Sequence, residues 1–152
     1  MKIEARLQEL GISLPEAASP VASYRPVVVQ GGLAYISGQL PFIGGNLKTG
    51  RLGESVDVNG GVEAARACGL MILAQLKAAG LLERVERGVK LGAFVSSTLD
   101  FTDQPKVANG ASDLMFDVFG EKGRHARAAV GVPVLPLGAA VEVDAVIAIS
   151  GD

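Results

Sequence analysis

Residues 127–149, RAAVGVPVLPLGAAVEVDAVIAI, contain the pattern that decides the fold class of this 152-residue chain. From about residue 139 to residue 149, apolar residues recur at every second position, which is typical of a β-strand with one buried face. The apolar side chains from Val141 to Ile149 share one face, whereas Glu142 and Asp144 share the other. This segment therefore predicts a half-buried strand of a sheet.

A second strand is predicted just before it, over about residues 127–134, with the segment LPLG as the connection. Its apolar residues from Ala128 to Val132 share one face at every second position, so that Arg127 and Ala129 share the opposite face. We therefore expect Arg127 to point away from the apolar layer, at the start of its strand.

The rest of the chain has the turn residues and the periodicity of strands and helices. The predicted elements are a short helix over residues 3–10, strands over 27–30 and 33–37 joined by Gly31–Gly32, a loop over 42–56, a helix from Asp57 or Asn59 to about Ala79, a strand over 88–99 and a helix from about 102 to 119. The last helix has the clearest apolar stripe. This order predicts an α+β fold, with one sheet and two long helices packed on one of its faces.

Length and composition limit the class of protein. The whole chain, 1–152, is predicted to be a single domain, with residues 1–25 as an N-terminal helix and loop extension. A net charge of −2 makes nucleic acid an unfavourable partner, because no positive field attracts its phosphates. The hydrophobic content of 49% favours a homo-oligomer that buries apolar surface between subunits, which would cover the second face of the sheet.

The sequence predicts no association with a membrane. Prolines and a glycine interrupt the longest uncharged stretch near the C-terminus, so no membrane helix is expected there. The first residues mix both charge signs and lack the apolar segment of a secretory signal. We therefore expect a cytoplasmic protein.

Few residues are available for metal or nucleophilic catalysis. With one cysteine, Cys68, and one histidine, His125, no metal site is predicted. Cys68 fits a buried helical position. His125 lies in a charged run, and no Gly-x-Ser-x-Gly motif is present, so we interpret it as a solvated loop histidine. The glycine pairs form no phosphate-binding loop.

Arg127 is the remaining candidate for function, and its position allows two interpretations. It could form an ion pair with Glu142 or Asp144 on the adjacent strand, and the pattern alone favours this interpretation. As a permanently charged, forked donor at a sheet edge, it could instead hold a carboxylate through two parallel hydrogen bonds, which a lysine cannot imitate. The surrounding motifs distinguish the two.

Three segments carry a resemblance to a known family. They are Ser37–Pro41 (SGQLP), Ala126–Arg127 followed by Leu135–Pro136, and Val141–Ala145 (VEVDA). In order and spacing the chain resembles the Rid, or YjgF-like, family of reactive intermediate deaminases over about residues 20–149. The resemblance implies a chorismate-mutase-like fold assembled as a homotrimer, in which clefts between subunits bind small imine or enamine acids without a cofactor.

The resemblance also implies roles for individual residues. Arg127 matches the arginine that holds the substrate carboxylate, and Glu142 matches the glutamate associated with the hydrolytic water. Residues that match Tyr24, Ser37 and Asn109 line the cleft. The helical stripe supports Asn109 independently, because this residue is rotated away from the apolar positions of its helix.

Some positions depart from the pattern of the family. Ala129 lies where many deaminases have a cysteine, so only a main-chain contact to the substrate is expected there. An N-terminal helix, one additional residue between Asn109 and Arg127, and the run GRHAR indicate a longer, divergent subgroup. Within that run, Arg124 and His125 could reshape the cleft or lie at its rim.

The sequence leaves three alternative functions open. The leading one is hydrolysis of 2-aminoacrylate-type imine acids to 2-keto acids and ammonia. The second is a binding protein that holds a small carboxylate metabolite, such as a keto acid, in the same cleft without turnover. The third, RNA cleavage or inhibition of translation, is a label that family members have also carried. The acidic composition, two tyrosines and absence of tryptophan argue against RNA.

Overall fold

The computed structural model of the protein describes residues 2–20 and 23–151. Its helices are α1 (Ile3–Glu9), α2 (Val58–Ala78) and α3 (Gln104–Phe119). Its strands are β1 (Val27–Gln30), β2 (Leu33–Gln39), β3 (Phe42–Ile43), β4 (Asn46–Leu47), β5 (Val85–Ser96), β6 (Ala126–Val132) and β7 (Val141–Ile149). Short 3-10 helices occupy Leu82–Arg84, Gly120–Gly123 and Pro136–Gly138.

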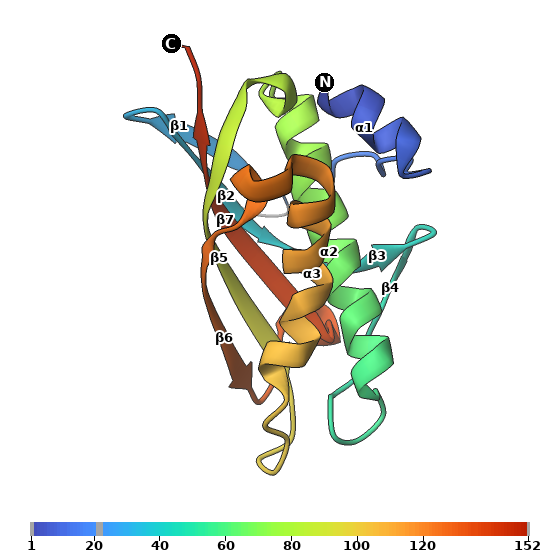
Figure 1. The fold of residues 1–152 in the computed structure, drawn as a ribbon. Helices are drawn as coiled ribbons and strands as arrows, with labels where there is room; N and C mark the ends of the chain where they lie inside the picture. Colours follow the sequence, from blue (N-terminus) through green and yellow to red (C-terminus); the bar gives the residue numbers. More distant parts are fainter. Residues whose placement is uncertain (1, 21–22, 152) are drawn as a thin grey trace.

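Five strands form one sheet in the order β1–β2–β7–β5–β6, and α2 and α3 cover one of its faces (Figure 1). Neighbouring strands in this sheet are antiparallel except β5 and β6, which are parallel. A parallel pair needs a crossover connection, and α3 provides it on the covered face. The predicted α+β fold, with two long helices on one face of a sheet, is confirmed.

The two long helices begin and end where the sequence provides caps. The side chain of Asp57 accepts a hydrogen bond from the backbone N–H of Gly60 at 2.7 Å, which caps α2. Gly80 follows this helix with a φ of +73°, a conformation that glycine adopts without strain. On α3 the predicted apolar stripe from Val107 to Val118 is buried. Among the described helices, none is long and apolar enough to cross a membrane.

Glycines bring α2 and α3 into close contact. A Cβ atom on Gly110 of α3 would overlap the carbonyl oxygen of Val62 on α2. A Cβ atom on Gly69 of α2 would approach the side chain of Leu114 on α3 to 2.9 Å. The buried Cys68 next to Gly69 lies in the same core, as expected. This packing fixes the position of α3 above the edge of the sheet.

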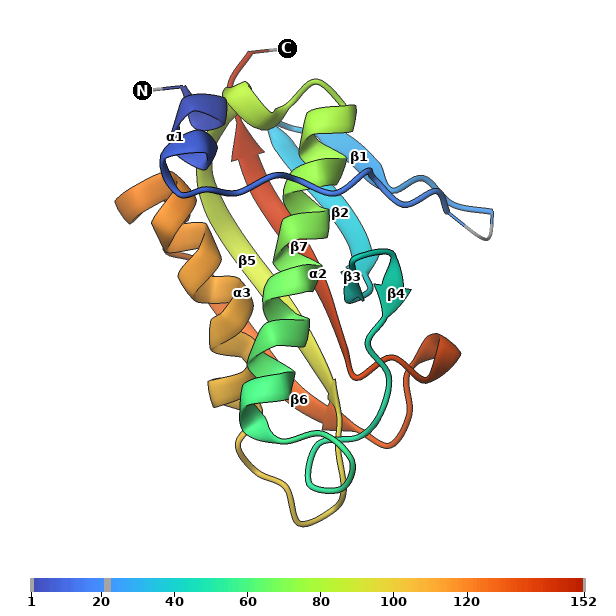
Figure 2. The same cartoon turned by 90° about the vertical axis from the view of Figure 1, so that its right-hand side faces the viewer.

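The N-terminal segment crosses the outer side of the helix layer (Figure 2). The predicted first helix is confirmed as α1, and the carboxylate of Glu83 accepts hydrogen bonds from the backbone N–H groups of Ile3 and Glu4. In the loop that follows, the carbonyl oxygen of Ala18 accepts a hydrogen bond from the side chain of Gln75 on α2 at 2.8 Å. Specific hydrogen bonds therefore hold both the helix and the loop on the core.

Two predicted segments have different limits in the structure. The segment predicted as a loop over residues 42–56 contains a short hairpin, in which β3 pairs with β4 around Gly44 and Gly45. Strands of two residues are too short to show a periodicity. The strand predicted over 88–99 is β5, which begins earlier, at Val85, and is central in the sheet between β7 and β6.

The arrangement of the two C-terminal strands also differs from the prediction. β6 and β7 are not neighbours, because β5 lies between them and pairs with both. Arg127 pairs with Leu91, which is buried under the helices, so Arg127 lies on the helix-covered face. The expectation that Arg127 points away from the apolar layer is therefore wrong. Val130, which is 45% exposed, faces the open side instead.

The error has a simple physical origin. A period of two identifies the two faces of a strand but not which of them is covered. In β6 both faces consist of small or apolar residues apart from Arg127, so that the sequence gives little contrast between them. Because β6 is an edge strand beside α3, the long arginine side chain can lie along the helix and still reach solvent.

Candidate functional site

Arg127 on β6 is held against helix α3 by three hydrogen bonds. Its Nη1 atom donates to Asn109 Oδ1 at 2.8 Å and to Ser112 Oγ at 3.1 Å, and its Nη2 atom donates to the carbonyl oxygen of Pro105 at 3.3 Å. Of the five guanidinium N–H groups, the one on Nε and one on Nη2 have no partner among the described residues. These neighbouring groups can form a parallel pair of hydrogen bonds to one carboxylate.

Asn109 and Ser112 are three residues apart on α3 and therefore lie on the same side of the helix, toward Arg127. Asn109 is exposed, in agreement with the prediction that it faces away from the apolar stripe. Ser112 was not among the residues predicted from the sequence. Its spacing from Asn109 was the available signal, because a partner of Asn109 one turn along the helix faces the same strand.

His125 precedes Arg127 by two residues and contacts the same helix. Its Nε2 atom lies 2.8 Å from Ser112 Oγ, and its Nδ1 atom lies 2.6 Å from the carbonyl oxygen of Gly123. The interpretation of His125 as a solvated loop residue is therefore wrong, because the ring is half-buried between α3 and the start of β6. We refer to Asn109, Ser112, His125 and Arg127 as the arginine group.

Burial of the ring lowers the pKa of His125 from its ordinary value of 6.5. The hydrogen bond to the Gly123 carbonyl opposes this shift, and the positive charge of Arg127 adds to it. The net direction is downward, so that the neutral imidazole is the dominant form at pH 7.

Glu142 lies on the open face of the sheet, where it pairs with Phe94 across β7 and β5. Its carboxylate rests on Gly38 of β2, because a Cβ atom at that position would overlap Oε2 of Glu142. The pKa of the half-buried Glu142 is raised from its ordinary value of 4.5, mainly by burial and further by the negative charge of Asp144. A carboxylate in this environment is a better proton acceptor than one in water.

Tyr24 and Ser37 line a small hollow of about 110 Å³, together with Gly38. Ser37 Oγ donates a hydrogen bond to the carbonyl oxygen of Pro26 at 3.1 Å, and the side chain of Tyr24 is 47% exposed. Because Gly38 lines this hollow and also supports the carboxylate of Glu142, these side chains belong to one region. We refer to Tyr24, Ser37 and Glu142 as the glutamate group.

The arginine group and the glutamate group lie apart within one chain. On β5, Leu91 pairs with Arg127 and Phe94 pairs with Glu142, so the two side chains are two strands apart and offset by about 10 Å along the sheet. They also point to opposite faces. The alternative of an ion pair between Arg127 and Glu142 or Asp144 is therefore excluded, and one small ligand cannot contact both groups of the same chain.

Ala129 lies on the same face of β6 as Arg127, two residues further along the strand. It is half-buried and packs against the core, where its partner on β5 is Ala93. Its methyl group offers no hydrogen bond, so any polar contact at this position has to come from the main chain, in line with the expectation from the sequence.

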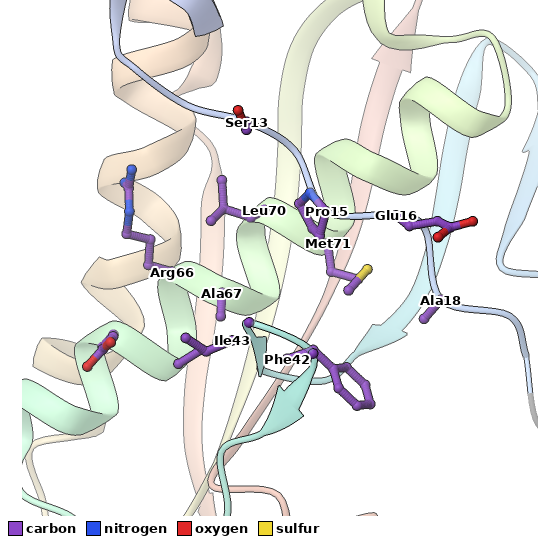
Figure 3. A pocket seen from close by; sticks show the side chains of 13 residues that line it. Ser13, Pro15, Glu16, Ala18, Phe42, Ile43, Arg66, Ala67, Leu70 and Met71 are labelled. Atoms are coloured by element: carbon purple, nitrogen blue, oxygen red, sulfur yellow. The ribbon is translucent and has the colours of Figure 1, made fainter.

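A larger hollow, of about 720 Å³, lies on the outer side of α2 (Figure 3). Its walls are the N-terminal loop around Pro15 and the β3–β4 hairpin, and its floor includes Leu70 and Met71. Its charged residues are Glu16, Glu63 and Arg66. None of the residues proposed from the sequence lines it. In the described part of the chain, no group of three or more His, Cys, Asp or Glu side chains is placed to hold a metal ion.

Comparisons with known proteins agree with the fold. Residues 4–148 match the family described as "YjgF/chorismate mutase-like, putative endoribonuclease". Protein TCP17 of Trypanosoma cruzi is 55% identical over 150 residues, which cover 96% of this chain and 93% of that protein. The crystal structure of Atu1372 from Agrobacterium tumefaciens has 49% identity and a TM-score of 0.90, and the match covers 97% of this chain and 92% of that chain.

A crystal structure from Shewanella oneidensis MR-1 has 35% identity and a TM-score of 0.94, and the match covers 98% of this chain and all of that chain (100%). A family match over nearly the whole chain and relatives of this identity and coverage all point to the same family. The chain therefore belongs to the YjgF/chorismate mutase-like, or Rid, family.

Proposed function

We propose that this protein hydrolyses enamine or imine acids of the 2-aminoacrylate type to 2-keto acids and ammonia. The observation that carries the proposal is the guanidinium of Arg127, which is held by α3 while no described residue accepts a hydrogen bond from Nε or from one N–H group of Nη2. Two adjacent donors of this kind match the two oxygens of a carboxylate. Membership of the Rid family supports an imine acid as the molecule that bears this carboxylate.

The reaction requires orientation, one water molecule and proton transfer. An enamine acid first takes a proton from the solvent at its terminal carbon and becomes the protonated imine. The imine carbon is electrophilic, and the oxygen of water adds to it while Arg127 holds the carboxylate. Glu142 accepts a proton from this water and returns it to the nitrogen. The carbon–nitrogen bond then breaks, the hydroxyl proton leaves with the nitrogen as ammonium, and the keto acid remains. The raised pKa of Glu142 suits a side chain that both accepts and donates a proton.

We propose further that each site is completed by a second copy of the chain. Arg127 and Glu142 lie on opposite faces of the sheet, so that the arginine group of one subunit needs the glutamate group of the next. The open face also exposes apolar side chains, among them Val28, Tyr35 and Val130. Burial of these side chains favours association. A homotrimer with three such clefts is the assembly that the family resemblance suggests.

The experiment that tests the deaminase proposal measures ammonia release. A dehydratase generates 2-aminoacrylate or 2-iminobutyrate in situ, and the wild-type protein is expected to accelerate the formation of ammonia and keto acid above the uncatalysed rate. Arg127→Ala is expected to lose this acceleration. Arg66→Ala is the matched control, because it removes the same charge from the hollow on the outer side of α2. Equal rates for wild type and blank over several imine acids would reject the proposal.

Binding of a small carboxylate without turnover is the second candidate. The presence of Ala129 favours it, because the strand that carries Arg127 offers no further side chain for proton transfer. Holding a carboxylate requires Arg127 but not Glu142. Calorimetry with 2-keto acids, combined with the ammonia assay, separates the two functions. Affinity that depends on Arg127 in a protein without turnover identifies a binding protein.

A further inference from the structure

We propose that Ser112 and His125 form a hydrogen-bonded relay that positions Arg127 for the carboxylate. The proposal rests on the proposed function, because it takes Arg127 as the group that contacts the ligand. The relay runs from Gly123 through His125 and Ser112 to Nη1 of Arg127, with contacts of 2.6, 2.8 and 3.1 Å. His125 and Ser112 do not contact the reacting atoms and are therefore positioning residues.

The direction of each hydrogen bond in the relay is fixed by chemistry. The carbonyl oxygen of Gly123 can only accept, so Nδ1 of His125 must carry the proton. In a neutral imidazole Nε2 is then an acceptor, and the hydroxyl of Ser112 must donate to it. With its proton turned toward His125, the oxygen of Ser112 presents a lone pair to Arg127, which donates from Nη1.

The backbone around His125 is shaped to hold the ring. A Cβ atom on Gly123 would overlap the carbonyl oxygen of Met115 on α3, so only glycine allows this turn to approach the helix. On β5, a Cβ atom on Gly88 would lie 3.2 Å from the Gly123 carbonyl oxygen and 3.5 Å from Cβ of His125. Gly123 thus allows the relay to form against the helix, and Gly88 leaves room for it on the side of the sheet.

Several arginines lie near the ring, and the charge of one of them, Arg127, favours its neutral form. Arg127 follows on β6, and Arg87 on β5 donates to the carbonyl oxygens of Gly88 and Arg124 at 3.1 and 2.7 Å. Arg124 itself forms an ion pair with Glu121 at 3.2 Å, and its guanidinium carbon lies over the ring of Phe116, 4.2 Å from the ring centroid. A positive charge on His125 would be repelled by Arg127, and its new Nε2 proton would compete with Arg127 for Ser112 Oγ.

Calorimetry with 2-oxobutanoate, a stable keto acid, tests the relay. We expect Ser112→Ala to weaken the affinity by about 10-fold, since the hydrogen bond to a charged group is lost and Nε2 of His125 is left without a donor. Ser112→Thr retains a hydroxyl and is expected to keep the affinity within about twofold. His125→Ala is expected to weaken it by about threefold, and His125→Gln, which retains an acceptor, by less.

Ser112→Ala in an Arg127→Ala background separates an effect on the position of Arg127 from an effect on folding. If Ser112 acts through Arg127, Ser112→Ala has no further effect on the residual affinity there. An equal loss in both backgrounds would overturn the relay. So would unchanged binding by Ser112→Ala in the presence of Arg127.

A spectroscopic measurement is independent of the ligand. His125 is the only histidine in the sequence, so that ¹⁵N NMR of the untagged protein reports its tautomer without ambiguity. We expect the proton on Nδ1, and an Nε2–H tautomer would overturn the relay even if the protein is active. A wild-type protein that has the expected tautomer but binds no keto acid and releases no ammonia would overturn the proposed function instead, and with it the role of the relay in binding.

Discussion

The arginine group and the glutamate group differ in how completely one chain builds them. Arg127 has three hydrogen bonds to α3, and one of its partners is fixed in turn by His125. Glu142 lies on the open face against Gly38, and burial and Asp144 are the only sources of its pKa shift. A single subunit therefore fixes the side chain that we propose to hold the carboxylate. The side chain proposed to transfer the proton has no comparable support from the described residues.

This difference indicates how the proposed site would work. The proposed binding depends on contacts that form when the chain folds, because the side-chain hydrogen bonds described above for the arginine group all come from α3, β6 or the turn between them. Proton transfer depends on bringing the open face of another subunit to the edge strand of the first. Substitutions in the two groups should therefore have separable effects, on turnover for one group and on affinity for the other.

The largest effect is expected from Glu142→Gln. Removal of the proton acceptor should lower kcat by about 10²–10⁴-fold, which is the usual contribution of a general acid–base group. Affinity for 2-oxobutanoate should change by less than about twofold, since Arg127 is intact. The melting temperature should stay the same or rise, because burial penalises the charge of Glu142 that the variant lacks. Kinetics, calorimetry and thermal unfolding of one preparation provide the three measurements.

A loss of affinity equal to the loss of turnover in Glu142→Gln would contradict the separation of the two groups. Asp144→Asn is the matched control, because it removes a carboxylate from the same face of the same strand. It should retain turnover within about an order of magnitude, since Asp144 acts only through its charge.

A smaller loss is expected from Arg127→Lys. Lysine keeps the charge but has no planar fork, so it can replace neither the bonds to α3 nor the parallel pair to the ligand. We expect kcat/KM to fall by about 100-fold, with most of the loss in KM. Arg66→Lys, on the outer side of α2, should leave both constants unchanged. If Arg127→Lys binds 2-oxobutanoate as well as the wild type does, a simple point charge is sufficient and the fork has no role.

The sequence predicted the elements of the fold better than the contacts between them. Helix α3 and strand β7 could be predicted because each buries one face and shows it in its periodicity. The position of β6 could not, since the parallel crossover through α3 places β5 between the last two strands. A periodicity describes one segment and contains no information about its neighbours in the sheet.

The residues of the candidate site were predicted unevenly for a similar reason. Asn109 could be identified from its rotation around α3. His125 was misinterpreted because its charged neighbours suggested a solvated loop, whereas a turn at Gly123 directs the ring to Ser112. Such a contact between a helix and the start of a strand depends on tertiary structure alone.

A mixed assembly tests whether the two groups meet between subunits. Arg127→Ala and Glu142→Gln chains, each inactive alone, are coexpressed with different tags and all oligomers are recovered. A trimer that mixes both chains has one cleft, out of three, with an intact Arg127 and an intact Glu142. At equal amounts of the two chains about three quarters of the trimers are mixed, so about a quarter of wild-type activity should return. Mixing the two purified proteins without exchange of subunits is the control. Recovery that does not exceed the sum of the separate variants would mean that each site lies within one chain.

The smallest effect concerns pH and tests the environment of the arginine group. The pKa of His125 is lowered by folding, so that the unfolded chain binds this proton first as the pH falls. The free energy of unfolding should therefore decline from about pH 6.5, the ordinary pKa, until the pH is below the folded pKa, where the loss is complete. Because the ring is half-exposed, solvent screening should limit this contribution to well under about 1 kcal/mol. Urea unfolding of wild type and His125→Gln from about pH 7.5 to about pH 5, the range in which histidine titrates, measures the contribution of His125. The carboxylates titrate alike in both proteins and cancel in the difference. If the wild type instead becomes more stable relative to His125→Gln as the pH falls, folding raises this pKa and the relay holds a charged histidine.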